Sequence, residues 1–360
     1  MHVRMRRRIL LGLGVAVTTA AGLAAVPATA SASGASPVVR QINLVSDQPG
    51  MAQLTDPYLV NAWGMSHGPG TPIWVSDNGA DVSTLYRGAV GGTAVSVVPL
   101  TVWTPGGAPT GQVFNDTTGF TVPGTTSPAL FVFAGENGDL SAWNQAVSPI
   151  TNAVAIGHVT DAVFKGLALV HSPFGPLLLA SDFHHNEIDV WDSTFTQLPV
   201  GKLFHDSSLP AGYAPFNIAE VGKRVFVTYA KQDAAKHDDV AGPGNGFIDV
   251  YTNYGALLTR FVNRGMLDSP WGMAVAPMTF GALGGDLLVG NFGDGRINAF
   301  NRNTGHLDGT LQDAHHNAIQ IDGLWGLMVG DSAAGGTSAV WFSAGPNDES
   351  HGLLGILRAG

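Results

Sequence analysis

Carboxylate and amide side chains recur along this chain at the ends of short apolar runs. Three of them, Asn61, Asn217 and Asp322, stand at or beside the start of one kind of run. A second set, which also includes an imidazole and a phenol, stands at the end of another kind of run or in the turn after it: Glu136, Asp182, His184, Tyr229 and Asn291. Oxygen ligands confined in a narrow space repel one another unless a cation neutralises them, and hard divalent cations prefer such ligands. These residues indicate a Ca²⁺ or Mg²⁺ site with a small polar ligand if the fold gathers them.

The apolar runs belong to a repeat that spans most of the chain. Each copy ends in a short strand-like run, and the residues that close these runs are Tyr86, Trp143, Trp191, Tyr251, Phe300 and Leu357. Successive closing residues lie between 48 and 60 positions apart. A period near fifty residues, built from short strands and turns, is typical of propeller blades. The sequence therefore predicts an all-β fold, a six-bladed β-propeller formed as one domain by residues 33–360.

Each copy also has an upstream anchor that we interpret as the innermost strand of its blade. The anchors are Asn61-Ala62-Trp63-Gly64, Val113-Phe114-Asn115, Phe164-Lys165-Gly166, Pro215-Phe216-Asn217, Pro270-Trp271-Gly272 and Leu324-Trp325-Gly326. Glycine in such a strand lets its neighbours approach the axis, where a side chain would clash. We expect the three tryptophans of these anchors to lie in the core.

The two ends of the repeat suggest how the ring closes. The last copy has no fourth strand, whereas residues 38–45 (VVRQINLV) form a spare strand before the first copy. The simplest arrangement makes this N-terminal strand the outer strand of blade six, which protects the edges that an open sheet would expose. An unclosed array or a pair of β-sandwich sheets is the alternative.

In a propeller, the start of each inner strand and the turn between the second and third strands emerge on the same face. We therefore expect Asn61, Asn217 and Asp322 to be metal ligands at one axial funnel, and the second set above to contact the ligand. Sequences such as Asp77-Asn78-Gly79 are also ordinary turn chemistry, so a turn-forming role is the alternative for the acids and amides between second and third strands, such as Glu136. At the mouths of the inner strands, where Asn61, Asn217 and Asp322 stand, nothing in a turn requires an amide or an acid. At most one ring of the adjacent pair His184 and His185 can face the axis.

Blade four carries a polar insertion at residues 231–246, on the face that bears the predicted site. A long segment in that place can act as a lid, or can supply a ligand from His237, Asp238 or Asp239. An elaborated loop without a role is the alternative.

The first 32 residues have the pattern of a secretory signal peptide of bacterial type. Four arginines precede an apolar stretch over residues 9–25, and small residues near Ala30 and Ala32 offer cleavage sites. The arginines loosely match a twin-arginine signal, and an uncleaved membrane anchor is the alternative. We expect a secreted, extracellular protein that does not touch the membrane after cleavage.

Composition narrows the classes of partner. The net charge of −10 argues against nucleic acid and anionic lipid as partners, and the chain has no cysteine for thiolate chemistry. Zinc-protease and serine-hydrolase signatures are also missing from the sequence. We expect a monomer that takes a small polar or glycan ligand.

Several strings, such as Gly290-Asn291-Phe292-Gly293-Asp294-Gly295, resemble a family of exported, uncharacterised bacterial proteins. The string in residues 229–244 is the most specific part of this resemblance. The repeats are more distantly similar to NHL-type propellers, gluconolactonase-like hydrolases and streptogramin lyases. In the lactonases, Glu, Asn and Asp hold an axial divalent metal at inner-strand starts. The resemblance implies that role for Asn61, Asn217 and Asp322, while the acid nearest to the family's glutamate is Asp56.

Two functions follow from these patterns. The first is a binding or scaffold module whose funnel holds a cation and a small polar or glycan ligand. The second is a metal-dependent hydrolase or lyase in which Asp182, His184 or Glu136 moves a proton. Fold analogy alone assigns no activity, so the first is preferred and catalytic residues stay unassigned.

Overall fold

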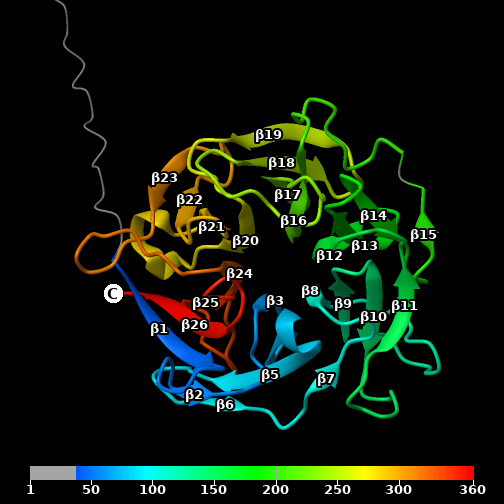
Figure 1. Cartoon of the computed structure of the whole chain (residues 1–360), viewed down its shortest axis with the longest axis horizontal. Helices are drawn as coiled ribbons and strands as arrows, with labels where there is room; N and C mark the ends of the chain where they lie inside the picture. Colours follow the sequence, from blue (N-terminus) through cyan, green and yellow to red (C-terminus); the bar gives the residue numbers. More distant parts are fainter. Residues whose placement is uncertain (1–37, 200) are drawn as a thin grey trace, which may run out of the picture. The chain divides into compact units, whose positions relative to one another are not determined.

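Six mainly antiparallel sheets surround one axis in the computed structural model, which describes residues 38–199 and 201–360 (Figure 1). Each sheet is one blade of the ring, so the predicted all-β six-bladed propeller is confirmed. The predicted leader, residues 1–32, lies outside the described residues. Within the described part of the chain, no helix is long and apolar enough to cross a membrane.

The strands of the first three blades follow one another along the chain, from the axis outward. Blade one consists of β3 (Ala62–Ser66), β4 (Ile73–Asp77), β5 (Val82–Gly88), β6 (Val95–Val97) and β7 (Val102–Trp103), which also pairs with β5. Blade two consists of β8 (Pro109–Phe114), β9 (Phe131–Gly135), β10 (Asp139–Trp143) and β11 (Val154–His158). Blade three consists of β12 (Phe164–Ser172), β13 (Gly175–Asp182), β14 (Glu187–Trp191) and β15 (Gln197–Leu198).

The other three blades complete the ring. Blade four consists of β16 (Tyr213–Val221), β17 (Arg224–Lys231), β18 (Gly246–Thr252) and β19 (Leu257–Asn263). Blade five consists of β20 (Pro270–Val275), β21 (Leu287–Asn291), β22 (Ile297–Phe300) and β23 (Leu307–Thr310). Blade six consists of β24 (Leu324–Val329), β25 (Ala339–Ala344), β26 (Leu353–Ala359), β1 (Val39–Ser46) and β2 (Leu54–Thr55). Two short 3₁₀ segments, η1 (Asn78–Ala80) and η2 (Met278–Leu283), lie in connections.

The second strand of a blade is buried on both of its faces because a neighbouring blade packs on each side. Every residue of β4, β9, β21 and β25 is buried. Strands in such an environment appear in the sequence as continuous apolar runs rather than as alternating patterns. This explains why the second strands are apolar runs in the sequence, whereas the partly exposed outer strands β11 and β19 are not.

The inner strands approach one another so closely that, at one position in five of the six strands, there is no room for a side chain. A Cβ atom at Gly64 would lie 2.4 Å from the carbonyl oxygen of Thr110, and one at Gly111 would lie 2.3 Å from the amide nitrogen of Leu167. Blades three, five and six carry glycine at the same register, and blade four carries Asn217. The expected role of glycine at the axis therefore holds for five blades.

The register of blade two differs from the prediction. The sequence analysis took Val113-Phe114-Asn115 as the anchor, whereas Pro109-Thr110-Gly111 is the segment equivalent to the anchors of the other blades. Asn115 follows the strand, and its amide group closes a loop by donating to the carbonyl oxygens of Gly119 and Ala129. Val113 and Phe114 were mistaken for the anchor because they too are apolar residues of a strand, β8, that lines the axis.

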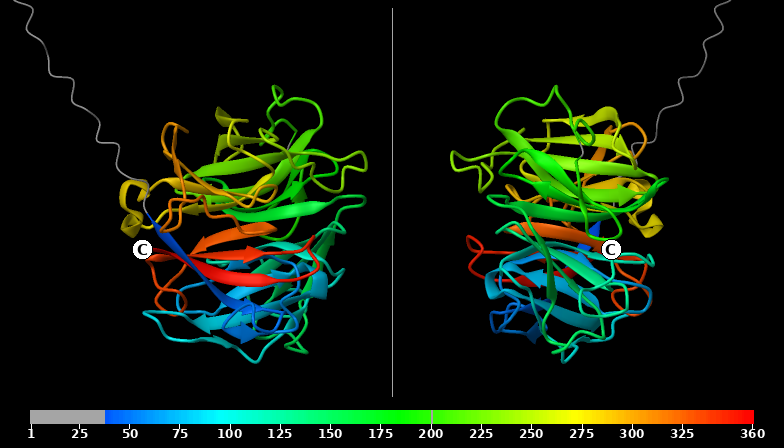
Figure 2. Two further views of the ribbon diagram at one scale, coloured as in Figure 1. Left: turned by 60° about the vertical axis from the view of Figure 1, so that its left-hand side comes forward. Right: turned by 90° about the vertical axis from the view of Figure 1, so that its right-hand side faces the viewer.

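The N-terminal strand closes the ring, as the sequence predicts. β1 pairs antiparallel with β26 from Val39 opposite Ala359 to Ser46 opposite Leu353, and Figure 2 shows the two strands side by side. Val39, Leu44 and Val45 are at most 2% exposed. One ladder thus joins the two ends of the described chain and covers the last edge of blade six.

A chain shortened to begin at Asp47 tests this closure. It loses the β1–β26 ladder and three buried apolar side chains, each of which contributes about 1.5–3 kcal/mol. We expect its melting temperature, followed by circular dichroism, to fall well below that of a chain beginning at Val38. Equal melting temperatures of the two chains would contradict the role of β1.

Candidate functional site

Six side chains at one register of the inner strands fill the middle of the axis, and we call them the axial ring. They come one from each blade and are all buried: Trp63, Thr110, Lys165, Phe216, Trp271 and Trp325. Trp63 stacks on Trp325 with ring centroids 3.5 Å apart, and Trp271 meets these two rings edge-on at 6.1 and 5.6 Å. The three tryptophans are therefore core residues, as the sequence predicts.

The axial ring separates two different environments. At the polar end, where the inner strands begin, charged and amide side chains form a hydrogen-bonded cluster. At the opposite end, the inner strands surround a cavity of about 450 Å³, which we call the axial cavity. The sequence-predicted site belongs to the polar end.

Lys165 is the member of the axial ring that organises the polar end. Its side chain is only 2% exposed, and its Nζ lies 2.5 Å from Oε1 of Glu136 and 3.5 Å from Oδ1 of Asp238. The ammonium group also lies 5.1 Å from the centroid of the Trp63 ring, a distance at which a cation is attracted to an aromatic face. A buried ammonium group is stable only with such partners. The protein thus supplies a cation of its own at the place where the sequence predicts a metal.

Amide side chains extend this cluster across blades one, two and six. Asn78 donates from Nδ2 to Oε2 of Glu136 at 3.0 Å, and its Oδ1 accepts from Nδ2 of Asn61 at 3.1 Å. The same Nδ2 of Asn61 donates to Oε1 of Glu349 at 3.1 Å, while its Oδ1 accepts from Nε1 of Trp325 at 3.2 Å. Every polar atom of the Asn61 amide group is therefore used within the protein.

The backbone supplies a second reason for asparagine at position 61. Asn61 has a φ of +48°, and Ala108 and Ser269 at the equivalent positions of blades two and five have φ values of +42° and +48°. Asparagine tolerates this left-handed region better than most residues other than glycine. The sequence analysis took nothing in a turn to require an amide here, and the backbone geometry corrects that assumption.

Acids outnumber bases at the polar end. Burial raises the pKa of Glu349, although its hydrogen bond from Asn61 and the charge of Lys165 oppose the shift. Burial also raises the pKa of Asp239, against the opposing influence of Ser269 and Lys165. Lys165 is the charged partner common to Glu136, Asp238, Asp239 and Glu349. The cluster therefore retains negative charge that a further cation or a proton would relieve.

The blade-four insertion, residues 231–246, reaches across this end of the axis. Gln232 donates from Nε2 to the carbonyl oxygen of Phe183 in blade three at 2.5 Å. Gly242 donates its N–H to Oδ1 of Asp268, at the start of blade five, at 2.6 Å. Between these two attachments Asp238 approaches Lys165, although the Asp238 side chain itself is 68% exposed. The segment thus covers the buried ammonium group and presents His237 and Asp238 to solvent.

The three predicted metal ligands occupy different surroundings. Asn61 belongs to the polar cluster described above. Asn217 lies beyond the axial ring and lines the axial cavity, where its Nδ2 donates to the Trp271 carbonyl oxygen and its Oδ1 accepts the N–H of Ile218, both at 2.8 Å. Asp322 is exposed and accepts the N–H of Asn347 at 2.8 Å. A cation shared by these three residues would have to replace several existing hydrogen bonds.

Of the residues predicted to contact a ligand, Glu136 lies in the polar cluster and the others have local partners. Asp182 is fully buried and accepts from the N–H of Val163 and from both the N–H and Nδ1 of His185. His184 is half-buried, with its ring edge-on to His185 at 5.2 Å.

Tyr229 and Asn291 lie inside the fold. Tyr229 packs between blades three and four, where its hydroxyl group lies 2.7 Å from that of Tyr251. Asn291 donates to the Met266 carbonyl oxygen and to Asp294. Asp56, the acid nearest to the lactonase glutamate, accepts from the hydroxyl group of Tyr86 at 2.9 Å and is buried.

Among the described residues, two groups of acids and imidazoles place their ligand atoms within 4.8 Å of one another. The first is Glu136 with His237 and Asp238, and the second is Asp182 with His185 and Glu187. Both are groups that could hold a metal ion. The first contains two residues of the insertion that the sequence analysis named as candidate ligands, and it lies beside Lys165.

The importance of Lys165 was visible in the sequence but was missed as a site. Four of the six blades carry tryptophan or phenylalanine at this register, and blade three carries lysine. A lysine in a column of buried aromatic residues requires carboxylate partners from elsewhere in the chain. That requirement was the available signal, although the sequence alone could not name Glu136 and Asp238 as the partners.

No family model matches the chain. An uncharacterised protein of Acanthamoeba polyphaga mimivirus is 32% identical over 324 residues, which cover 87% of this chain and 78% of that protein. A second uncharacterised protein of the same virus is 31% identical over 325 residues, with 87% and 84% covered. The chain belongs to the family of these proteins. They are viral, whereas the resemblance noted in the sequence was to bacterial proteins.

Solved structures share the fold at low sequence identity. A protein of unknown function from Bacteroides thetaiotaomicron matches 89% of this chain and 76% of its own, with 13% identity and a TM-score of 0.53. An α-L-arabinanase of Penicillium chrysogenum, in complex with arabinobiose, matches 89% and 98%, with 11% identity and a TM-score of 0.53. A streptogramin B lyase matches 89% and 97%, with 9% identity and a TM-score of 0.48. At such identities the likeness concerns the fold alone.

Replacement of Lys165 by methionine tests the charge balance of the polar end. The variant leaves Glu136 without its buried partner, and breaking a buried ion pair costs about 3–5 kcal/mol. Urea unfolding at pH 7 should show a loss of this order in the free energy of unfolding. The exposed Lys231, replaced in the same way, is the control and should change little. Equal losses in the two variants would contradict the central place of Lys165.

Proposed function

We propose that the protein is a binding module whose polar end takes a divalent cation together with a small polar or glycan ligand. The observation that carries the proposal is the convergence of Glu136, His237 and Asp238, whose ligand atoms lie within 4.8 Å of one another. Two carboxylates and one imidazole suit a cation, and the carboxylates favour Ca²⁺ or Mg²⁺. The insertion supplies two of the three ligands, which gives this segment a role.

A cation at the proposed site must compete with Lys165 for the carboxylate of Glu136. Oε1 of Glu136 lies within hydrogen-bond distance of Nζ of Lys165, so an incoming cation must displace the ammonium group or share the carboxylate with it. Two positive charges a few ångströms apart repel each other. We therefore expect weak to moderate affinity in the native protein and a higher affinity when the lysine charge is removed.

A small polar ligand would complete the coordination. His237 and Asp238 are exposed, so a bound cation there would keep open positions toward solvent. Hydroxyl groups of a glycan are oxygen ligands of the kind that Ca²⁺ accepts. The group formed by Asp182, His185 and Glu187 is a weaker candidate, because the oxygens of Asp182 already accept three hydrogen bonds.

Thermal unfolding in a titration with CaCl₂ or MgCl₂ tests the cation site. Binding to the folded state alone raises stability by about 2.7 kcal/mol when the cation concentration is a hundred times Kd. We expect Glu136→Gln and Asp238→Asn to abolish the increase in melting temperature, and Lys165→Met to shift it to lower cation concentration.

Asp322→Asn separates the proposed ligands from the set that the sequence predicts. If Glu136, His237 and Asp238 hold the cation, this variant should show the same cation-dependent increase in melting temperature as the native protein. If Asn61, Asn217 and Asp322 hold it, the increase should be smaller. Absence of any response to either cation in the native protein would sink the proposal. Glycan binding is then tested on an oligosaccharide array with Ca²⁺ and with a chelator, and retention should require the cation.

We also propose that the protein acts outside the cell, after removal of the leader near Ala30 or Ala32. The support is the arginine-rich and apolar pattern of the first residues. Intact-mass measurement of secreted material should show a chain that begins close to these residues. Recovery of residues 1–25 in a membrane fraction would contradict export with cleavage.

A further inference from the structure

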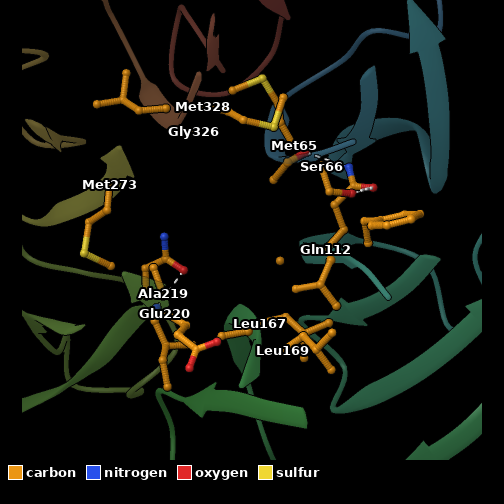
Figure 3. A pocket seen from close by; sticks show the side chains of 18 of the residues that line it. Met65, Ser66, Gln112, Leu167, Leu169, Ala219, Glu220, Met273, Gly326 and Met328 are labelled. Atoms are coloured by element: carbon orange, nitrogen blue, oxygen red, sulfur yellow. Dashed lines mark hydrogen bonds between the residues drawn. The ribbon is translucent and has the colours of Figure 1, made fainter. Parts of the chain in front are cut away.

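The axial cavity is a second concave site, at the end of the axis opposite the polar cluster. All six inner strands contribute to its wall, and its volume of about 450 Å³ lies in the range of small-molecule pockets. Figure 3 shows the labelled side chains surrounding an open centre. Trp271 and Asn217 belong to its lining, so the cavity ends against the axial ring.

The wall of the cavity is mainly apolar and adaptable. Met65, Met273 and Met328 project from blades one, five and six, and Leu167 and Leu169 lie across from Met65 and Met328 (Figure 3). The three methionines are only half-buried, so part of their apolar surface is free to be covered by a ligand. Unbranched thioether side chains adjust to ligands of different shape. The wall therefore suits the apolar body of a small organic molecule.

The rim of the cavity is acidic on one side. His171 is held between two carboxylates, with Nε2 2.9 Å from Oδ1 of Asp116 and Nδ1 2.7 Å from Oε2 of Glu220. Glu220 is only 11% exposed and also accepts the N–H of His171. These three residues come from blades two, three and four, so the inner strands of three blades, and not a single loop, position the rim. One imidazole cannot neutralise two carboxylates.

The other side of the rim repeats this charge pattern more loosely. His67 donates from Nε2 to the carbonyl oxygen of Val329 at 3.1 Å, and its Nδ1 lies 3.7 Å from Oδ2 of Asp331. The cavity lining contains no lysine or arginine among the described residues. The charged groups around the cavity thus favour a positive ligand over a negative one.

We propose that the axial cavity binds a small organic cation, with its apolar body against Met65, Met273 and Met328 and its ammonium group at Asp116 and Glu220. Charge complementarity selects the head group and the apolar wall selects the body. The buried axial ring lies between this site and the polar end, so the proposal is independent of the cation site at Glu136. Its success or failure leaves that site untouched.

Three probes with one apolar body and different heads test the proposal: hexylamine, hexan-1-ol and hexanoate. Isothermal titration calorimetry on the native protein at pH 7 should show saturable binding of hexylamine, weaker binding of hexanol and none of hexanoate. Glu220→Gln should weaken hexylamine binding by about tenfold, because a charge-assisted contact is lost. Met273→Lys, which fills the cavity with a like charge, should abolish it.

Asp161→Asn is the matched control. It removes one acid from an exposed position whose φ of +60° asparagine tolerates well, and it should leave hexylamine binding unchanged. Two results with the native protein alone would overturn the proposal: equal affinity for the three probes, or no binding of hexylamine. Unaltered hexylamine affinity in Glu220→Gln, with thermal unfolding showing a folded variant, would overturn it as well.

Discussion

The close approach of six inner strands to one axis is the constraint on which the rest of the structure depends. It requires glycine at one register in five blades, because the backbone of the next strand occupies the place of a side chain. One residue earlier in each strand, the side chains turn to the axis itself and fill it as the axial ring. Aromatic residues suit this narrow, dry space, and the ring they form divides the axis into two independent ends. The chemistry of the polar end is set by Lys165, the single charged residue in that ring.

Lys165 is stabilised by partners that the ring alone does not provide. Glu136 comes from the turn of blade two and Asp238 from the insertion of blade four, so three blades meet at one ammonium group. A buried ion pair of this kind contributes little net stability compared with apolar packing, but it is costly to break. The contact between Lys165 and Asp238 therefore holds the insertion over the axis, while the side chains of His237 and Asp238 stay exposed to solvent. The polar end is thus both a structural closure and the place where a cation can compete.

The sequence predicted the parts of the fold that repeat and missed the parts that depend on single contacts. The second strands were recognised because they are buried on both faces, and ring closure followed from one missing and one spare strand. The anchor of blade two was misplaced by four residues because Pro109-Thr110-Gly111 has no aromatic residue to mark it. At the site, Glu136 and the insertion were found from their residue types, whereas Lys165 was not, since its partners are 29 and 73 positions away. Asn61 was selected for its amide group, but its left-handed backbone also favours asparagine.

The central claim is that Lys165 is the resident cation of the polar end and that a divalent cation competes with it for Glu136. A crystal structure of the protein grown with MnCl₂ tests this most directly, because manganese can be located by its anomalous scattering. The account predicts an anomalous peak between Glu136, His237 and Asp238, with Nζ of Lys165 moved away from Oε1 of Glu136. A peak shared by Asn61, Asn217 and Asp322, or an unchanged Lys165–Glu136 pair with no manganese at this end of the axis, would contradict it.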